Sequence, residues 1–169
     1  MKIWIAVILA ITLSPLDAVS QSETNDITTF ILVRHAEKAD ESEDPELSPE
    51  GVERSDLLAR MLSEVEFDAV YTTPYVRTTE TVLRIADRNQ IEINEYESDD
   101  PESLAGVLIE MHKGMFVLIA GHSNTLPQLA NALLGRMEFS ENLDESDYEN
   151  ILIVTITSGG AANLLHMKF

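Results

Sequence analysis

Two arginines and two histidines stand where the chain is expected to leave a strand or enter a helix. Arg34 and His35 follow the apolar run FILV, Arg77 lies within TTPYVRTTETV, and His122 follows MFVLIAG. Guanidinium groups match the oxygens of a phosphoryl group, and a histidine beside them can act as a nucleophile toward phosphorus. For the first stretch alone, a solvated Arg34 and a capping or packing His35 explain the pattern equally well. The four residues together favour a phosphoryl site.

Short apolar segments that alternate with amphipathic ones predict the elements that would position these residues. Strands are expected at residues 27–33, 68–72, 91–93, 115–120, 151–156 and 161–167, with helices between the first five and a hairpin turn at SGG. The sequence therefore predicts an α/β fold. It is a three-layer sandwich with a mostly parallel central sheet, helices on both faces and a C-terminal β-hairpin. Ligands of such sheets bind at the carboxyl ends of the strands.

Capping residues indicate where the helices begin. Ser48 is expected to cap a helix that starts at Pro49, and Thr73 and Pro74 are expected to open another with Arg77 in its first turn. Apolar residues at helical spacing predict the buried faces. In the first and third helices these are Leu57, Leu58, Met61, Leu62, Val65, Leu104, Val107, Leu108 and Met111.

The first twenty residues have the pattern of a secretory signal peptide. Lys2 precedes an apolar run at residues 3–13, and Ala-Val-Ser precedes Gln21. We therefore expect a signal peptide at 1–20, one domain at 21–169, and a secreted or periplasmic protein. An uncleaved anchor is the alternative, although 11 apolar residues are too few for an ordinary membrane span. After cleavage no stable membrane insertion is expected.

The composition is strongly acidic, with 30 acidic against 11 basic residues and a net charge of −19. Nucleic acid and anionic membranes need a basic face, so neither is an expected partner. Residues 39–46, ADESEDPE, hold five carboxylates and are expected to form a solvated loop, with a lid or a weak cation site as alternatives. The chain has no cysteine and no pair of histidines at ligand spacing, so neither a metal nor a cofactor is expected.

Four segments resemble the motifs of the histidine phosphatase superfamily, which has the phosphoglycerate mutase-like fold. They are LVRHAEK, LSPEGVERSDLLA, TTPYVRTTETV and AGHSNT, in that order along the chain. The resemblance implies that His35 attacks phosphorus and forms a phosphohistidine, which water then hydrolyses. It also implies that Arg34, Arg77 and His122 bind the phosphoryl oxygens and stabilise the transition state. Asn124 is a further candidate for phosphate binding, or simply starts a helix.

The residue that would protonate the leaving group is not apparent from the motifs. Larger members of the family carry a glutamate after the arginine helix, and here Glu95 and Glu97 are the candidates in that short region. Both are equally explained as solvated loop residues. Glu37 is a third candidate, or it orients an arginine of the site. A compact chain with an uncertain acid is similar to the small branch that includes the phosphohistidine phosphatases. His112 and His166 are interpreted as structural.

These residues leave three functions open. The first is a phosphatase that hydrolyses a phosphomonoester or phosphoramidate through a phosphohistidine on His35, with a phosphorylated small molecule or phosphoprotein as substrate. The second is a non-catalytic module that binds a phosphorylated ligand in the same pocket. The third is a phosphotransferase or mutase, which the small number of basic residues outside the motifs disfavours.

Overall fold

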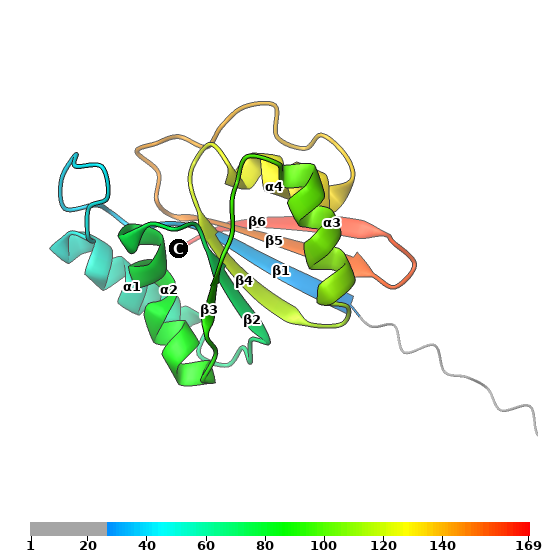
Figure 1. The fold of residues 1–169 in the computed structure, drawn as a ribbon, viewed down its shortest axis with the longest axis horizontal. Helices are drawn as coiled ribbons and strands as arrows, with labels where there is room; N and C mark the ends of the chain where they lie inside the picture. Colours follow the sequence, from blue (N-terminus) through cyan, green and yellow to red (C-terminus); the bar gives the residue numbers. More distant parts are fainter. Residues whose placement is uncertain (1–26) are drawn as a thin grey trace, which may run out of the picture.

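A six-stranded sheet in the order β3-β2-β4-β1-β5-β6 forms the centre of the molecule (Figure 1). The computed structural model describes residues 27–169, so the expected signal peptide lies outside the described residues. Parallel pairing joins β1 to β4, β4 to β2 and β2 to β3, whereas β5 pairs antiparallel with both β1 and β6. The strands are β1 Ile27–Arg34, β2 Ala69–Thr72, β3 Ile93–Glu95, β4 Phe116–Gly121, β5 Asn150–Thr157 and β6 Ala162–Lys168.

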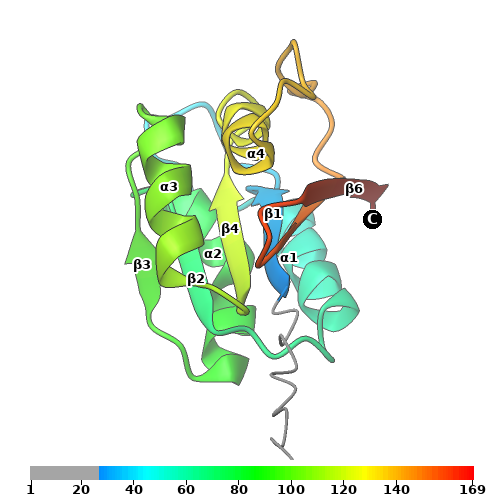
Figure 2. The same cartoon turned by 90° about the vertical axis from the view of Figure 1, so that its right-hand side faces the viewer.

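Four helices cover the two faces of this sheet (Figures 1 and 2). They are α1 Pro49–Met61, α2 Val76–Asn89, α3 Pro101–Met111 and α4 Leu126–Leu134. Helices α3 and α4 pack on one face, and α1 and α2 pack on the other. The predicted α/β sandwich, its mostly parallel sheet and its C-terminal hairpin are therefore confirmed. None of these four helices, within residues 27–169, has the length and apolar character needed to cross a bilayer.

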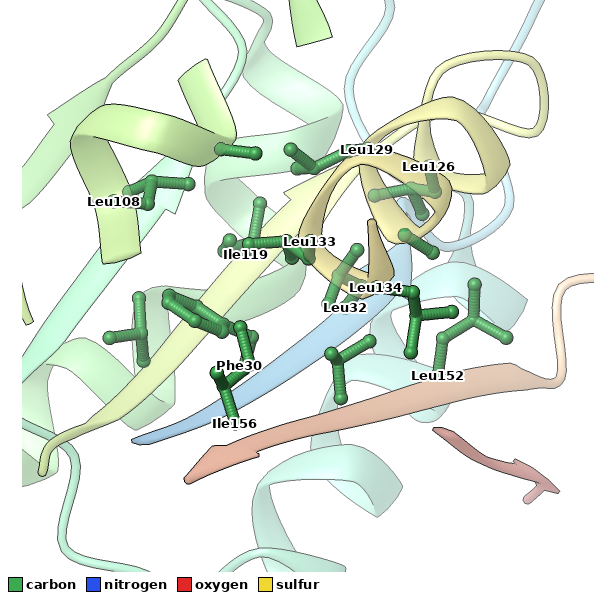
Figure 3. Close-up of a cluster of buried hydrophobic side chains, with 14 of the residues drawn as sticks. Phe30, Leu32, Leu108, Ile119, Leu126, Leu129, Leu133, Leu134, Leu152 and Ile156 are labelled. Atoms are coloured by element: carbon green, nitrogen blue, oxygen red, sulfur yellow. The ribbon is translucent and has the colours of Figure 1, made fainter. Parts of the chain in front are cut away.

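The central strand β1 supplies side chains to both apolar cores. Phe30 and Leu32 point to the α3/α4 side, where Figure 3 shows them among leucines of α4, and Ile31 and Val33 point to the α1/α2 side. All four are at most 4% exposed, and each such burial contributes about 1.5–3 kcal/mol. The strand that ends in Arg34 is consequently held from both faces of the sheet.

The strand register brings the ends of β1 and β4 to one level. Arg34 pairs with Gly121, and the backbone N–H of His35 donates to the Gly121 carbonyl at 2.9 Å. His122 follows Gly121 directly and so lies beside His35. A side chain on Gly121 would collide with the Tyr96 hydroxyl, at 2.6 Å from an added Cβ, which explains the glycine before the histidine.

The helix starts were predicted with mixed success. Ser48 caps α1 as expected, since its hydroxyl accepts the Gly51 N–H at 3.1 Å. The prediction that Thr73 and Pro74 open α2 is wrong, because the helix begins at Val76. The Thr73 side chain instead hydrogen-bonds to other side chains near the sheet, and the intervening residues are extended or turning.

Some predicted buried faces are also wrong. Leu58, Leu62 and Leu108 are buried, but Leu57, Met61, Val107 and Met111 are between 37% and 61% exposed. Helix α1 packs on the sheet through Leu58, with Leu62 just after it, and its N-terminal end lies close to the loop after β1, where an added Cβ on Gly51 would lie 2.2 Å from the Glu37 carbonyl. The buried face of the helix is therefore narrower than the predicted apolar stripe.

Candidate active site

A cavity of about 630 Å³ opens at the carboxyl ends of the parallel strands, and all four predicted site residues line it. Arg34 and His35 come from the end of β1, His122 from the end of β4, and Arg77 from the first turn of α2. Figure 2 shows α4 and the 135–149 loop at this end of the sheet, toward which β4 points. The prediction that the strand ends bring these four residues together is therefore confirmed.

His35 is held in an orientation suited to a nucleophile. The residue is only 5% exposed. Its Nδ1 lies 2.8 Å from the Ala36 carbonyl, which can only accept, so Nδ1 carries the proton and Nε2 of the neutral ring keeps its lone pair. The Ala36 N–H in turn donates to the Thr81 hydroxyl at 2.9 Å, which fixes the backbone beside the ring.

Burial, followed by the positive charges of Arg34 and Arg77, lowers the pKa of His35 to about 4. His122 has a pKa lowered to about 4 for the same reasons, burial first and then Arg77 and Arg34. Both imidazoles of the ligand-free cavity are therefore neutral at pH 7. A phosphoryl dianion bound beside the two rings would raise the pKa of both.

The second histidine faces the first. The ring centroids of His35 and His122 are 5.3 Å apart in an edge-to-face arrangement. The Thr73 hydroxyl lies 2.9 Å from His122 Nε2 and also donates to the Thr78 hydroxyl at 3.2 Å. This threonine pair holds the His122 ring against the floor of the cavity. The sequence analysis missed this role of Thr73, because it assigned the residue to a helix cap.

Arg34 is tied to the loop that precedes β5. Its Nη1 donates to the backbone carbonyls of Asp144 at 3.2 Å and Glu145 at 2.6 Å. Its guanidinium lies over the Tyr148 ring, 4.0 Å from the centroid. The residue is only 6% exposed, and its Nε is buried with no hydrogen-bond partner among the described residues. An incoming oxygen anion would supply such a partner.

Arg77 is held by side chains alone. It stacks on Tyr75 with 4.2 Å between guanidinium carbon and ring centroid, and its Nη1 lies 3.6 Å from Asp44 Oδ1. The same Oδ1 accepts the Val76 N–H at the start of α2, at 2.9 Å. The buried Nη1 of Arg77 has no hydrogen-bond partner within residues 27–169. This is a second donor available to a phosphoryl oxygen.

The three candidate proton donors lie elsewhere. Glu37 accepts from Arg54 Nε at 2.7 Å and forms a close ion pair with Arg54 Nη2 at 2.6 Å. Glu95 ends the edge strand β3, and Glu97 follows it. Among the described residues, Asn124 lines the cavity, whereas Glu37, Glu95 and Glu97 do not. The carboxylates that do line it are Glu41, Glu43 and Glu145.

Three residues of the site carried no recognisable sequence signal. Tyr75 and Tyr148 each stack on one arginine of the floor, and Asp44 balances Arg77. Asp44 lies in the 39–46 loop, which is otherwise largely exposed, as a solvated loop should be. Tyr148 lies in an irregular acidic segment without periodicity. Only contacts between segments distant in the sequence identify these three residues.

The described residues hold no cluster of three or more histidine, aspartate or glutamate side chains placed to bind a metal ion. The two histidines that we interpret as structural also lie outside the cavity lining. His112 Nε2 lies 2.9 Å from the Tyr71 hydroxyl, and His166 Nε2 lies 2.7 Å from Asn150 Oδ1. The cavity therefore brings together arginines, neutral histidines and hydrogen-bond donors, a set suited to a tetrahedral oxyanion.

Comparison with known proteins relates part of this chain to phosphatases. A family model described as "Histidine phosphatase superfamily (branch 1)" matches residues 30–98. Phosphoserine phosphatase 1 of Hydrogenobacter thermophilus is 39% identical over 71 residues, which cover 38% of this chain and 34% of that protein. The match thus spans about a third of the length of this relative.

Solved structures show the same fold. The protein histidine phosphatase SixA, complexed with tungstate, superposes with a TM-score of 0.68 at 19% identity, covering 83% of this chain and 96% of that chain. The phosphoserine phosphatase of Entamoeba histolytica, in complex with 3-phosphoglyceric acid, gives 0.63 at 17% identity, covering 84% and 97%. The resemblance is confirmed over the first three motifs, because residues 30–98 match the model of the histidine phosphatase superfamily, and the described chain has the fold of these solved phosphatases.

Proposed function

We propose that this protein is a phosphatase that hydrolyses a phosphomonoester or phosphoramidate through a phosphohistidine on His35. The observation that carries the proposal is the geometry of His35. Its Nδ1 is bound to the Ala36 carbonyl, its pKa is about 4, and its ring lies among His122, Arg34 and Arg77. A neutral imidazole with a free Nε2 in a cationic cavity is a nucleophile for phosphorus.

The reaction follows from these groups in two displacements. His35 Nε2 forms a bond to phosphorus while the P–O or P–N bond to the leaving group breaks, and the leaving group takes up a proton. Water then attacks the phosphohistidine, the N–P bond breaks, and inorganic phosphate leaves. The unpartnered donors of Arg34 and Arg77 bind the equatorial oxygens, where charge is concentrated in the transition state.

The leaving group is expected to need little acid assistance. The three carboxylates considered as proton donors lie outside the cavity lining, and Glu37 is engaged by Arg54. A phosphoramidate, or an ester of an acidic alcohol, leaves without strong protonation. We therefore expect kcat to fall steeply as the pKa of the leaving alcohol rises across a series of aryl phosphates.

The test is a rapid acid or base quench during turnover of radiolabelled p-nitrophenyl phosphate. We expect label on the protein that is stable in base and lost in acid, and we expect His35→Ala to abolish both label and turnover. His166→Ala is the matched control, because His166 lies outside the cavity lining, and it should retain both. Full activity in His35→Ala would disprove the proposal.

A non-catalytic phosphate-binding module is the second candidate, and the position of Glu37, Glu95 and Glu97 outside the cavity lining is what favours it. Such a module would bind inorganic phosphate with wild-type affinity and turn over none of the substrates above. A mutase is disfavoured by the floor of the cavity, which has donors for one phosphoryl group. Detecting exchange of phosphate between two positions of one substrate would reinstate it.

We also propose that the protein acts outside the cytoplasm, in the periplasm or as a secreted protein. The support is the charged start, apolar run and small residues that precede Gln21. Mass spectrometry of the protein from fractionated cells should find Gln21 as the first residue. Retention of Met1 in the cytoplasmic fraction would contradict the proposal.

A further inference from the structure

A chain of hydrogen bonds beside the cavity ends on the ring of His122. It runs from Thr78, in the first turn of α2, through Thr73, which precedes that helix, to His122 Nε2. Thr78 is fully buried and Thr73 is only 1% exposed, so solvent does not reach these hydroxyl groups. The direction of each hydrogen bond therefore follows from the donors and acceptors within the chain.

Each of the two hydroxyl groups has a single proton to donate. Thr78 Oγ1 lies 2.8 Å from the carbonyls of Thr73 and Tyr75, which can only accept, so its proton is used there. Thr78 Oγ1 therefore accepts from Thr73 Oγ1, at 3.2 Å. The proton of Thr73 is used in turn, and its oxygen accepts from His122 Nε2 at 2.9 Å. Neutral His122 thus carries its proton on Nε2 and a lone pair on Nδ1.

The neutral form of His122 is the one present in the ligand-free cavity at pH 7. Burial first, and then the charges of Arg77 and Arg34, lower the pKa of His122 to about 4. The rings of His35 and Tyr75 both face it edge-on, each with 5.3 Å between centroids. The other titratable groups that line the cavity are Lys38, Glu41, Glu43, Glu145 and Tyr148. The tautomer of His122 is therefore defined before any ligand binds.

The lone pair of His122 is open to the cavity. Its Nδ1 has no hydrogen-bond partner within residues 27–169 and is not one of the buried atoms that lack a partner, so it is accessible from the cavity that His122 lines. His35 has the opposite tautomer, with its proton on Nδ1 and its lone pair on Nε2. Each imidazole consequently offers the cavity a lone pair in place of an N–H group.

These lone pairs determine how many protons a ligand complex contains. A phosphoryl dianion carries only acceptors, so one of its oxygens can bind His122 Nδ1 only through a shared proton. We propose that Thr73 is a positioning residue that fixes this tautomer, and that the cavity binds a phosphoryl group together with one proton, held between His122 Nδ1 and a phosphoryl oxygen. A monoanion brings this proton as its P–OH group, whereas a dianion takes it from solvent. The inference deepens the proposed function and rests on it for the nature of the ligand.

The first test is the tautomer of His122 in the ligand-free wild type at pH 7. Long-range proton–nitrogen NMR distinguishes a ring nitrogen that carries a proton from one with a lone pair, and His122→Gln and His35→Ala assign the signals. We expect the proton on Nε2 in His122 and on Nδ1 in His35. An Nδ1–H tautomer of His122 overturns the inference, and this result depends on no variant.

The second test counts the protons taken up when inorganic phosphate binds. Isothermal titration in buffers of different ionisation enthalpy gives this number at about pH 8 to 9, well above the second pKa of a phosphoryl group, about 6. The wild type should take up close to one proton per phosphate, and its affinity should fall about tenfold for each pH unit. An absence of proton uptake contradicts the inference.

Two variants of histidine assign this proton to its site. The amide of His122→Gln has an N–H group that donates without taking up a proton, so its uptake should fall to zero. His166→Gln is the matched control, because His166 lies outside the cavity lining, and it should keep the wild-type uptake. Uptake of a full proton by His122→Gln would place the proton on another group and remove the inference.

The role of Thr73 is tested by changing the acceptor of the Nε2 proton. Thr73→Val removes that oxygen, so His122 can populate the Nδ1–H tautomer, and the proton uptake should fall toward zero. Thr73→Ser restores the oxygen and should restore both the tautomer and the uptake. Wild-type tautomer and uptake in Thr73→Val would show that Thr73 does not position the ring.

A change one step further along the chain tests the same role without touching His122 or its acceptor. Thr78→Val leaves the Thr73 proton without an acceptor, so Thr73 can donate it to Nε2, and the tautomer should shift toward Nδ1–H. Thr79→Val is the matched control from the same helix, because its hydroxyl lies 3.4 Å from Thr72 Oγ1 and outside this chain. An unchanged tautomer in Thr78→Val contradicts the assigned directions.

Failure of this inference is distinguishable from failure of the proposed function, because tautomer and proton uptake are measured without turnover. Label on His35 and turnover of p-nitrophenyl phosphate, with no proton uptake on phosphate binding, would leave the phosphatase and remove the inference. Uptake of one proton with neither label nor turnover would remove the phosphatase and support the inference for a site that only binds phosphate.

Discussion

The two arginines of the cavity floor are held by different parts of the fold. Arg34 ends the buried strand β1, is 6% exposed, and donates to backbone carbonyls of the loop before β5. Arg77 lies in the first turn of α2 and faces only the Asp44 side chain, at 3.6 Å. Each guanidinium stacks on a tyrosine, so the difference lies in their polar partners.

Because of this difference, we expect the two arginines to have different roles. Arg34 donates to carbonyls of this loop, and the Glu145 carbonyl has Arg34 as its partner, so Arg34 holds the loop in place as well as lining the cavity. Arg77 satisfies no backbone group and is available to the ligand once a phosphoryl oxygen competes with Asp44. We therefore expect Arg34 to contribute to both folding and binding, and Arg77 chiefly to binding.

The largest expected effect is that of replacing each arginine, and it distinguishes their roles in folding and in binding. Arg34→Ala and Arg77→Ala should each lower kcat/KM for p-nitrophenyl phosphate by about 100- to 1,000-fold, as for loss of a fixed transition-state donor. Arg34→Ala should also lower the free energy of unfolding by about 1–3 kcal/mol, because it removes the hydrogen bond to the Glu145 carbonyl. Urea unfolding measures this loss. An equal loss of stability in Arg77→Ala would remove the distinction.

A pH titration tests the charge that both arginines place on His35. The pKa of His35 is lowered to about 4 by burial and then by Arg34, His122 and Arg77. Its imidazole signals in NMR should therefore titrate near pH 4 in the ligand-free protein. Removing either arginine should raise the midpoint, because a positive charge that disfavours the imidazolium is lost.

Protein stability should follow the same titration. The unfolded histidine binds its proton near pH 6.5, whereas the folded one does so near pH 4. The unfolded state thus binds more protons between these values, so stability should fall as pH decreases through this window. Bound phosphate should reduce the fall. A midpoint of 6.5 in the wild type would contradict the expected burial.

The smallest effect concerns Asp44. Asp44→Asn keeps an oxygen for the Val76 N–H but removes the charge beside Arg77. The inhibition constant for inorganic phosphate should fall about fivefold, in line with the loss of one like-charge interaction in a solvated site. Asp40→Asn is the matched control from the same loop, since Asp40 accepts only from the Ser42 N–H. A rise in the constant for Asp44→Asn would mean that Asp44 orients Arg77.

Sequence patterns predicted the fold where several signals agreed. The run from Phe30 to Val33 is apolar on both sides and became the central strand, and SGG became the hairpin turn. The patterns failed where one helix could rotate. Leu57 and Met61 continue the stripe of Leu58, yet the buried face of the helix is centred on Ser55 and Leu58, and it leaves Leu57 and Met61 37% and 44% exposed.

The residues of the candidate site were also predicted only in part from the sequence. His35, Arg34, Arg77 and His122 could be predicted because each sits at an element boundary and within a motif. Tyr148 and Glu145 could not, because their loop has no periodicity and approaches the site only through contacts with Arg34. Glu37 was a candidate acid from its place in the chain, but the 2.7 Å hydrogen bond from Arg54 occupies its carboxylate.

The amino-acid sequence by itself determined the order of strands and helices, the acidic charge, and the two arginines and two histidines that face one end of the sheet. Local patterns are sufficient for this, because strand ends in a parallel sheet share an edge. Only the tertiary structure decided which acidic residues line the cavity. Glu43 and Glu145 are separated by 102 positions, and they meet at one cavity because Asp44 is held at α2 and the Glu145 carbonyl at Arg34.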